Sequence, residues 1–525
     1  MVPPHGGSLP LFAPLLQPEG GVPGRLPPHP QAARGRGIPD RGAPAVHQAG
    51  PPPLLASRFS QGSTHPLPLA LPARGEGGVT AFKENAMERH EQKTATAATW
   101  GTQVRTRTMA THRYKQISVL TMNTFAFTVC FAVWVMFSII GIPIKGALGL
   151  NETQFGILAA TPILSGSLIR LPLGMWTDKY GGRIVFFILM LCTIVPIYLV
   201  SAATAYWHFL LLGLFIGLAG GAFSVGISYT ARWFTKARQG FAMGIFGAGN
   251  AGAAVTKFLA PSLVVAYGWQ MVPKVYAVAM LVTAILFWAF TFTEHSHKVS
   301  STVTIKDQLA ALRDPKVWRY CQYYAIVFGG YVGLSLWMTK YYINEYGFDI
   351  RTAALVAAIF VLPSGVIRAL GGWLSDRFGA HTVTCWVMWV SGGCLLLLSI
   401  PHFDVVVTTV NGPVARHVGL NVWVFTSLLF VVGIAWGFGK ASVFKHISDE
   451  YPHNIGVISG IVGLIGGLGG FVLPIMFGAL VDLTGVRSTA FMLLYGSTCV
   501  SLFWMYLALK KENVHRKLKT ADILE

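Results

Sequence analysis

Two arginines, Arg170 and Arg368, are the residues of this sequence with the clearest capacity for chemistry. They lie within two mostly apolar stretches, LSGSLIRLPLGMWTDKYGGR and LPSGVIRALGGWLSDRFGAH. Asp178 and Asp376 follow them at the same distance, so each residue of the second pair stands 198 positions after its counterpart. The chain therefore contains a repeated unit with one arginine inside each apolar segment.

The sequence offers these arginines no obvious carboxylate partner. At a rise of 1.5 Å per residue, Arg170 lies about 12 Å from the turn at Asp178, near the centre of a bilayer core about 30 Å thick. A charge at that depth costs about 2.5–3.5 kcal/mol. No Asp or Glu falls inside any helix expected below, so an anion from outside the chain is a better partner than a buried acid. The arginine fork donates two parallel hydrogen bonds, which suits a small anion with planar oxygens.

Membrane-spanning helices are the elements that must position the arginines. Hydrophobic residues make up 53% of the 525 residues and charged residues 12%, against roughly 25% charged in soluble domains. From Ile117 onward, apolar stretches of about 20 residues, the length that crosses a bilayer, alternate with short polar links. The pattern predicts an all-α membrane protein with twelve transmembrane helices in two pseudo-symmetric six-helix bundles. The expected helices are 117–142, 154–174, 184–203, 207–230, 240–264, 270–293, 319–343, 350–373, 382–402, 420–440, 455–480 and 487–510.

The basic residues predict the orientation of the chain. Most of them fall in the even-numbered links and the C-terminal tail, so both termini are expected in the cytoplasm. The same distribution accounts for the net charge of +19 without a nucleic-acid partner. The expected divisions are a disordered, dispensable Pro/Gly/Arg-rich extension over 1–112, a bundle over 113–293, a cytoplasmic linker over 294–318, a bundle over 319–510 and a cytoplasmic tail over 511–525. Met87 and Met109 are alternative start codons.

The turn that follows each arginine suggests a gate. Asp178 and Asp376 can cap a neighbouring helix N-terminus and pair with nearby basic residues, which would latch one conformation. Arg183 and Arg377 are the further gating candidates, and the second turn, in which His381 replaces the arginine, is expected to latch more weakly. Two six-helix halves with this turn between their second and third helices resemble the major facilitator superfamily. The resemblance implies two bundles that rock about a substrate site near the membrane midplane.

Glycines concentrate in two further stretches, GIFGAGNAGAAVTKFLAP and GIVGLIGGLGGFVLP. The first satisfies G-x-G-x-x-G, but no strand precedes it, so a dinucleotide site is disfavoured. Glycines at this spacing instead let two helix backbones approach closely. Asn250 is the polar exception in the first stretch and can hydrogen-bond an anion or a neighbouring helix. The candidate packing glycines are Gly247, Gly249, Gly252, Gly463, Gly466, Gly467 and Gly470.

These glycine stretches, with one arginine in each of the second and eighth helices, are similar to the nitrate/nitrite porter family, NarK-type, over residues 113–510. The resemblance implies that Arg170 and Arg368 clamp nitrate, and possibly nitrite as a second substrate, with Asn250 beside them. It also implies a bacterial inner membrane as the location.

The same resemblance assigns four aromatic residues to the anion site, where their rings would sandwich the planar anion. Tyr324 and Phe328 lie four residues apart, so they share a helix face on spacing alone. Ordinary packing is the alternative role for each ring. The four residues are Phe131, Phe223, Tyr324 and Phe328.

Two lysines bear on how such a transporter would be driven. Moving a monovalent anion against 100 mV costs about 2.3 kcal/mol, so uptake needs protons or exchange for another anion such as nitrite. Lys257 lies two turns after Asn250, and Lys440 ends the tenth expected helix. A buried lysine can exchange a proton, whereas snorkelling to the interface is the alternative for Lys440. The residues around both lysines look like the nitrate/proton symporter branch, so symport is favoured over nitrate/nitrite exchange.

Other classes of protein fit the sequence less well. An enzyme is disfavoured because no nucleophile with a base partner and no metal-ligand cluster appears, and no cofactor or metal is expected. A nitrate receptor would need a signalling domain that neither terminus resembles, and a carrier of another small anion is disfavoured by the glycine stretches. The six cysteines lie in apolar runs without C-x-x-C spacing, which argues against a disulfide framework. The expected partners are the anion, protons and the lipid bilayer, and the expected state is a monomer.

Overall fold

The computed structural model describes residues 112–293, 306, 310–410, 412–451 and 455–524. The chain divides into two units, Met1–Ala86 and Met87–Glu525, and every described residue belongs to the second. The expected extension before residue 112 and most of the expected linker over 294–318 lie outside the described residues.

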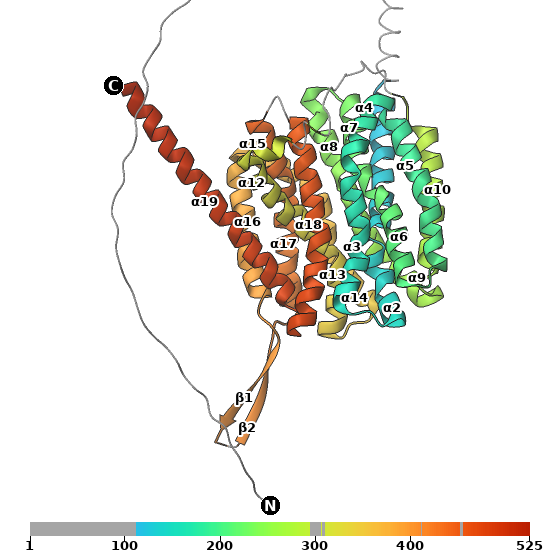
Figure 1. The fold of residues 1–525 in the computed structure, drawn as a ribbon, viewed down its shortest axis with the longest axis vertical. Coiled ribbons are helices and arrows are strands. Elements are labelled where there is room, and N and C mark those ends of the chain that lie inside the picture. Colours follow the sequence, from blue (N-terminus) through green and yellow to red (C-terminus); the bar gives the residue numbers. More distant parts are fainter. Residues whose placement is uncertain (1–111, 294–305, 307–309, 411, 452–454, 525) are drawn as a thin grey trace, which may run out of the picture. The chain divides into compact units, whose positions relative to one another are not determined.

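The first half of the described chain is helical from end to end (Figure 1). Its first helix covers residues 112–134. The helices that follow are α2 (Phe137–Leu148), α3 (Glu152–Leu168), α4 (Arg170–Tyr180), α5 (Gly182–Leu199), η1 (Val200–Ala202), α6 (Tyr206–Gly217), η2 (Leu218–Gly221), α7 (Ala222–Trp233), α8 (Lys236–Gly247), η3 (Ala248–Ala251), α9 (Gly252–Tyr267) and α10 (Met271–Phe290).

The second half repeats this arrangement and adds a hairpin. Its last helix continues past residue 510, where the expected tail begins. The elements are η4 (Ala311–Arg313), α12 (Pro315–Tyr324), the π-helical η5 (Ala325–Gly330), α13 (Tyr331–Tyr346), α14 (Ile350–Val366), α15 (Arg368–Phe378), α16 (Ala380–Leu398), β1 (Phe403–Thr409), β2 (Gly412–Val418), α17 (Val422–Glu450), α18 (Ile455–Thr484) and α19 (Thr489–Leu524).

Among the described residues, eight helices are long and apolar enough to cross a membrane, or ten if each bent pair counts as one span. The two bent pairs, α3 with α4 and α14 with α15, are the second and eighth expected helices. The fifth and seventh expected helices correspond to helical runs that contain η3 and η5, and neither run is among these spans. The helical membrane fold predicted from the sequence is confirmed, and its departures from regularity fall in the helices that carry the predicted site.

The bends are equivalent in the two halves. The helix axis turns by 40° between α3 and α4 and by 49° between α14 and α15. Pro172, in the first turn of α4, has no N–H to donate to the carbonyl of Leu168, which helps to end α3 there. Each short helix then stops at a glycine with positive φ, Gly181 at 89° and Gly379 at 86°, a conformation that side chains with a Cβ rarely adopt.

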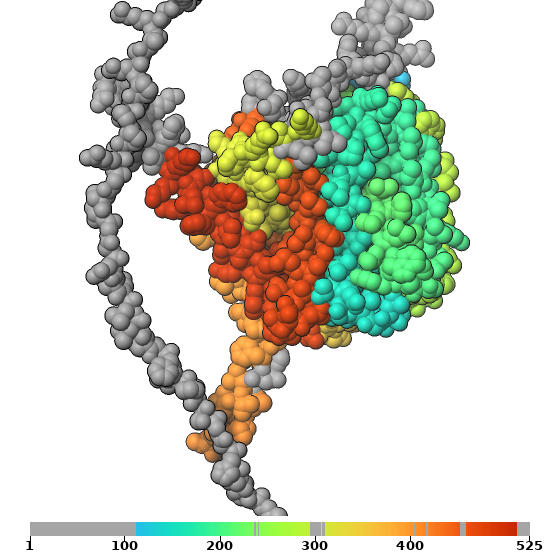
Figure 2. Space-filling model, in the orientation of Figure 1, coloured from blue at the N-terminus to red at the C-terminus, as the bar shows by residue number. Residues whose placement is uncertain are grey.

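Helices α3 and α18 pack antiparallel and join the two halves. Figures 1 and 2 show them side by side. Glycines bring the backbones into contact: a Cβ at Gly156 would lie 2.4 Å from the carbonyl oxygen of Pro474. One at Gly467 would lie 2.3 Å from the Ser167 hydroxyl. Small residues permit this approach in membranes, where packing replaces the hydrophobic effect as the source of association.

An antiparallel hairpin, β1 and β2, fills part of the link between α16 and α17 (Figure 1). Its register pairs Phe403 with Val418 and Val407 with Val414. The sequence analysis treated this segment as an ordinary link. It did not use the available signal, which is three consecutive valines followed by Asn411-Gly412, a dipeptide typical of hairpin turns.

Candidate functional site

Arg170 and Arg368 occupy equivalent places at the two bends. Each is the first residue of the short helix that follows the bend, α4 in the first half and α15 in the second. Both are buried, with 4% and 9% of their surface exposed. The bends therefore position one guanidinium group from each half inside the bundle.

Arg170 is held by one backbone acceptor and a ring of aromatic side chains. Its Nη1 donates to the carbonyl of Gly463 in α18, at 3.0 Å, and its Nε has no hydrogen-bond partner among the described residues. The guanidinium carbon lies 5.2 Å from the ring centre of Phe328 and 5.6 Å from those of Phe223 and Trp134. Aromatic faces stabilise a cation by about 0.5–2 kcal/mol, but they do not replace the oxygen acceptor that Nε lacks.

Arg368 shares one of these rings. Its guanidinium carbon lies 5.4 Å from the centre of Phe223 and 5.6 Å from that of Phe444. Its Nη1 is buried and has no hydrogen-bond partner among the described residues. Phe223, from α7, is therefore the side chain that contacts both cationic groups.

No described carboxylate lies within ion-pair distance of Arg170 or Arg368. Two buried like charges without a counter-ion are costly in a medium of low dielectric constant. A small anion between the two groups would supply both the missing charge and the missing acceptors.

Tyr324 and Phe328 lie on the wall of this site. Their rings are stacked, with centroids 5.2 Å apart and an angle of 9° between planes, and Phe444 meets Tyr324 edge-on at 4.9 Å. The π-helical η5 carries Phe328 and follows Tyr324 directly. The Tyr324 hydroxyl is buried without a described partner, so it can donate to a bound anion.

Asn250 lies in η3, at the interruption of the fifth predicted helix. Both side-chain polar atoms are buried and lack a described partner. Its backbone carbonyl accepts from the Tyr331 hydroxyl at 3.3 Å. Phe131 does not contact Arg170 directly but packs against Trp134, whose ring lies beside Arg170. Its ring centroid lies 5.3 Å from that of Trp134 and 5.8 Å from that of Phe127. Asn250 thus has free donor capacity, whereas Phe131 supports a ring beside Arg170.

The glycines of the first stretch lie where other residues approach closely. A Cβ at Gly252 would lie 2.1 Å from the carbonyl oxygen of Thr128, in the first helix. Gly249 faces the same helix. Gly247 faces Arg368 of the opposite half, and a Cβ at Gly247 would lie 3.3 Å from the Arg368 Cδ.

The glycines of the second stretch behave similarly, with one exception. A Cβ at Gly466 would lie 2.2 Å from the Tyr324 ring, and Gly467 and Gly470 also face neighbouring helices closely. Gly463 differs, because nothing lies within 4 Å of the place its Cβ would take. Its contribution is the carbonyl that accepts from the first arginine.

Both candidate lysines are buried without an acidic partner among the described residues. Lys257 donates to the Thr339 hydroxyl of the opposite half at 2.9 Å. Lys440 donates to the Ser364 carbonyl and hydroxyl at 3.0 Å each, and its ammonium lies 3.3 Å from the ring centre of Tyr331.

The prediction that Lys440 ends the tenth helix is wrong. Helix α17 continues to Glu450, and Lys440 is fully buried, so the snorkelling alternative is excluded as well. The uniformly apolar run stops near Lys440, but the next ten residues keep a helical alternation of apolar and polar side chains.

The predicted gating acids each pair within their own half. Asp178 contacts Arg232 of α7 at 2.5 Å, and Asp376 contacts Lys445 of α17 at 3.4 Å and is more exposed. The second pair is longer and more exposed, and the weaker second latch stays a prediction.

The two gating arginines contact aromatic side chains. Arg183 donates to the Trp288 carbonyl at 2.6 Å and lies over its ring at 4.1 Å. Arg377 is exposed and lies beside the rings of Trp373 and Phe378, at 5.7 Å each. Their gating roles remain predictions.

The sequence analysis missed two residues of the site, Trp134 and Phe444. Phe444 follows Lys440 by one helical turn. If the tenth helix had been predicted to continue past Lys440, Lys440 and Phe444 would both have been placed inside the bundle. Trp134 donates to the Pro162 carbonyl at 2.7 Å, and only its neighbour Phe131 had been singled out.

Comparisons with known proteins identify the family and support the fold. The family model of the Major Facilitator Superfamily matches residues 123–474 and 344–522. Solved structures support the fold: a bacterial homologue of the human lysosomal transporter Spinster, in an inward-facing and occupied conformation, aligns with a TM-score of 0.58. It shares 15% identity, over 75% of this chain and 97% of that chain.

Three curated relatives are similar in sequence over most of their length. The "Probable nitrate/nitrite antiporter NarK1" of Thermus thermophilus is 39% identical over 76% of this chain and 93% of its own. The "Nitrite extrusion protein" of Bacillus subtilis is 30% identical over 74% and 94%. The "Probable nitrate transporter NarT" of Staphylococcus haemolyticus is 31% identical over 71% and 92%.

The fold and the family model define the chain as a secondary transporter of the Major Facilitator Superfamily, not an enzyme. Within that superfamily, the chain belongs to the NarK-type nitrate/nitrite porter family. The relatives favour the exchanger alternative of the sequence analysis over the symporter branch, because one is described as an antiporter and another as an extrusion protein.

Proposed function

We propose that this protein exchanges nitrate for nitrite across a membrane by alternating access. The observation that carries the proposal is the pair of buried arginines, one from each half, without a carboxylate partner among the described residues. The names of the relatives supply the identity of the anions.

The bound anion would lie between the two guanidinium groups, each of which can donate two parallel hydrogen bonds to planar oxygens. The Tyr324 hydroxyl and the Asn250 amide would add donors, since neither has a described partner. Phe223, which contacts both guanidinium groups, would lie against the anion.

The charges of the site support exchange. An empty site holds two like charges that repel each other, and closing it would remove both from water without a counter-ion. One bound monovalent anion offsets part of that charge and bridges the halves. The loaded transporter should therefore change conformation more readily than the empty one, which makes inward and outward steps obligatorily coupled through an anion.

Nitrate/proton symport is the second candidate, because it has candidate proton carriers in Lys257 and Lys440. After it releases nitrate, a symporter must change conformation with an empty anion site. The arginines of the empty site repel each other, so a lysine would have to lose its proton to reduce the positive charge. Under the exchange proposal, the two lysines instead hold Thr339 and Ser364 in place.

We also propose a bacterial inner membrane as the location, with both termini in the cytoplasm and a monomer as the working unit. The distribution of basic residues supports the orientation.

Purified protein in proteoliposomes tests the mechanism. Nitrate uptake should require internal nitrite or nitrate and should not respond when an inward proton gradient is collapsed. Lys257→Gln should leave exchange independent of the gradient, as in the unchanged protein. Uptake into vesicles without an internal anion, driven by the proton gradient and lost in Lys257→Gln, would establish symport instead.

A further inference from the structure

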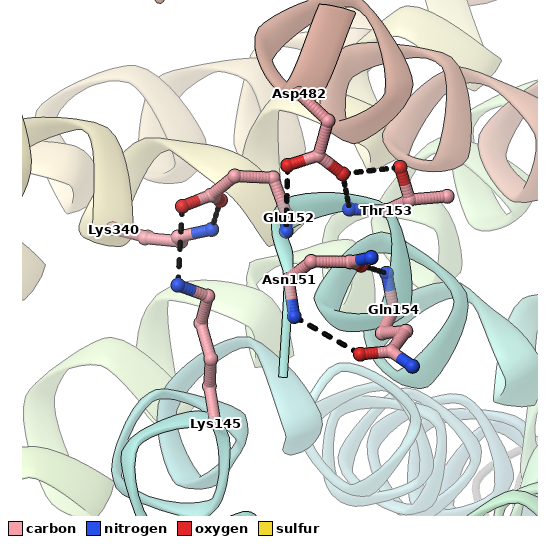
Figure 3. Close-up of polar contacts among 7 residues, drawn as sticks. All are labelled: Lys145, Asn151, Glu152, Thr153, Gln154, Lys340 and Asp482. Carbon is pink, nitrogen blue, oxygen red and sulfur yellow. Dashed lines mark hydrogen bonds and ion pairs between the residues drawn. The ribbon is translucent and has the colours of Figure 1, made fainter. Parts of the chain in front are cut away.

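A cluster of charged and polar residues joins the two halves (Figure 3). It lies where α2 ends, and Figure 1 shows this end of the bundle opposite α4 and α15, which carry Asp178 and Asp376. The orientation proposed above places this end outside. The cluster, which we call the outer latch, consists of Lys145, Glu152, Thr153, Lys340 and Asp482.

Glu152 is the centre of the outer latch. Its carboxylate pairs with Lys145 of α2 at 3.1 Å and with Lys340 of α13, which belongs to the opposite half. Lys340 is 4% exposed, and its ammonium lies 4.2 Å from the ring centre of Phe155 and 4.7 Å from that of Trp337. Because Lys340 is buried, withdrawal of the Glu152 carboxylate would leave its ammonium without a counter-charge in a poorly solvated place, which is costly.

Asp482 contributes a second connection between the halves. From the last turns of α18, its carboxylate accepts from the backbone N–H of Glu152 at 3.1 Å and that of Thr153 at 2.8 Å, and from the Thr153 hydroxyl at 2.5 Å. These N–H groups belong to the first turn of α3, where an anion is favoured by the helix dipole. Asn151 and Gln154 of the same half cap the turn from the other side.

The backbones themselves meet at this point. A Cβ at Gly478 would lie 2.3 Å from the carbonyl oxygen of Glu152. Asp482 follows Gly478 by one helical turn, so the close approach at the glycine sets the distance at which the carboxylate reaches α3. The polar contacts and the packing therefore depend on the same register of α3 against α18.

We propose that the outer latch closes the outer side of the transporter and that its release is a required step in opening toward the outside. The latch joins one half to the other, whereas the pairs of Asp178 and Asp376 each stay within one half. Separation of the outer ends must break the Glu152–Lys340 pair and withdraw Asp482 from α3. This role does not depend on which anion is carried or on how transport is coupled.

Hydrogen–deuterium exchange of the full-length protein, without nitrate or nitrite, tests the proposal. Asp482→Asn removes the charge from the helix N-terminus, which should shift the equilibrium toward the outward-open state by about three- to tenfold. Amide exchange should rise by this factor at the outer ends of α3, α9, α13 and α14 together. Asp349→Asn is the matched control, because Asp349 also places a carboxylate at a helix N-terminus but caps α14 within its own half. It should raise exchange only in the first turn of α14.

Gly478→Ala provides a second variant that keeps every polar group, in case Asp482→Asn does not fold. It should produce the same pattern, because the added Cβ pushes the Glu152 carbonyl away. Faster exchange confined to the first turn of α3 would reduce Asp482 to a local cap and overturn the proposal. Unchanged exchange in both variants would overturn it as well.

Discussion

Arg368→Lys isolates the contribution of the guanidinium fork to anion binding. Lysine keeps the charge but offers one ammonium on a flexible stem in place of two coplanar N–H groups. In the structure, Nη1 of Arg368 is buried without a described partner, so a bound anion is the acceptor that lysine would fail to satisfy. Loss of one charge-assisted hydrogen bond costs about 1.5–3 kcal/mol, which corresponds to nitrate binding weaker by about 10- to 150-fold.

Isothermal titration of the purified protein with nitrate in detergent measures this effect without requiring transport. Arg351→Lys is the matched control, because Arg351 is the second residue of the same bent pair of helices and is exposed. The control should bind nitrate as the unchanged protein does. Equal affinity in Arg368→Lys and in the control would refute the assignment of the fork to the anion, and the charge alone would then account for binding.

Three further predictions concern the walls of the site. Gly466→Ala should weaken nitrate binding by about tenfold in the same titration, because its Cβ would meet the Tyr324 ring 2.2 Å away and must displace it; wild-type affinity would show that the ring position is unimportant. Phe223→Ala should lower the thermal midpoint of unfolding and weaken binding together, since it removes contacts with both guanidinium groups; a loss of stability with unchanged affinity would confine the ring to packing. Lys440→Met should keep or raise the thermal midpoint, because an apolar side chain of similar volume replaces a buried charge, and a lower midpoint would mean that the bonds to Ser364 stabilise the fold.

The parts of this molecule that could be predicted from the sequence are those with a local signal. Apolar runs of membrane length predicted the helices, and the 198-residue offset predicted the equivalence of the two halves. The placement of Arg170 and Arg368 at bends was not predicted, because the sequence analysis used the apolar pattern, which a straight helix and a bent one share. Pro172 and Pro363 were the available signals for a kink. The end of α17 was missed for a related reason: the apolar run stops near Lys440 although the helix does not.

The outer latch shows why polar contacts between residues far apart in the chain could not be predicted from the sequence. Asp482 and Glu152 are 330 positions apart, and in the sequence each is an acid near a helix end, with nothing to connect them. The glycines that permit α18 to pack on α3 are visible, but the register of the two helices is not. A shift of one helical turn moves a side chain about 5.4 Å along the axis, enough to separate the Asp482 carboxylate from the first turn of α3. The latch therefore exists in one register only, so the packing of Gly478 against Glu152 must be retained for the polar contacts to form.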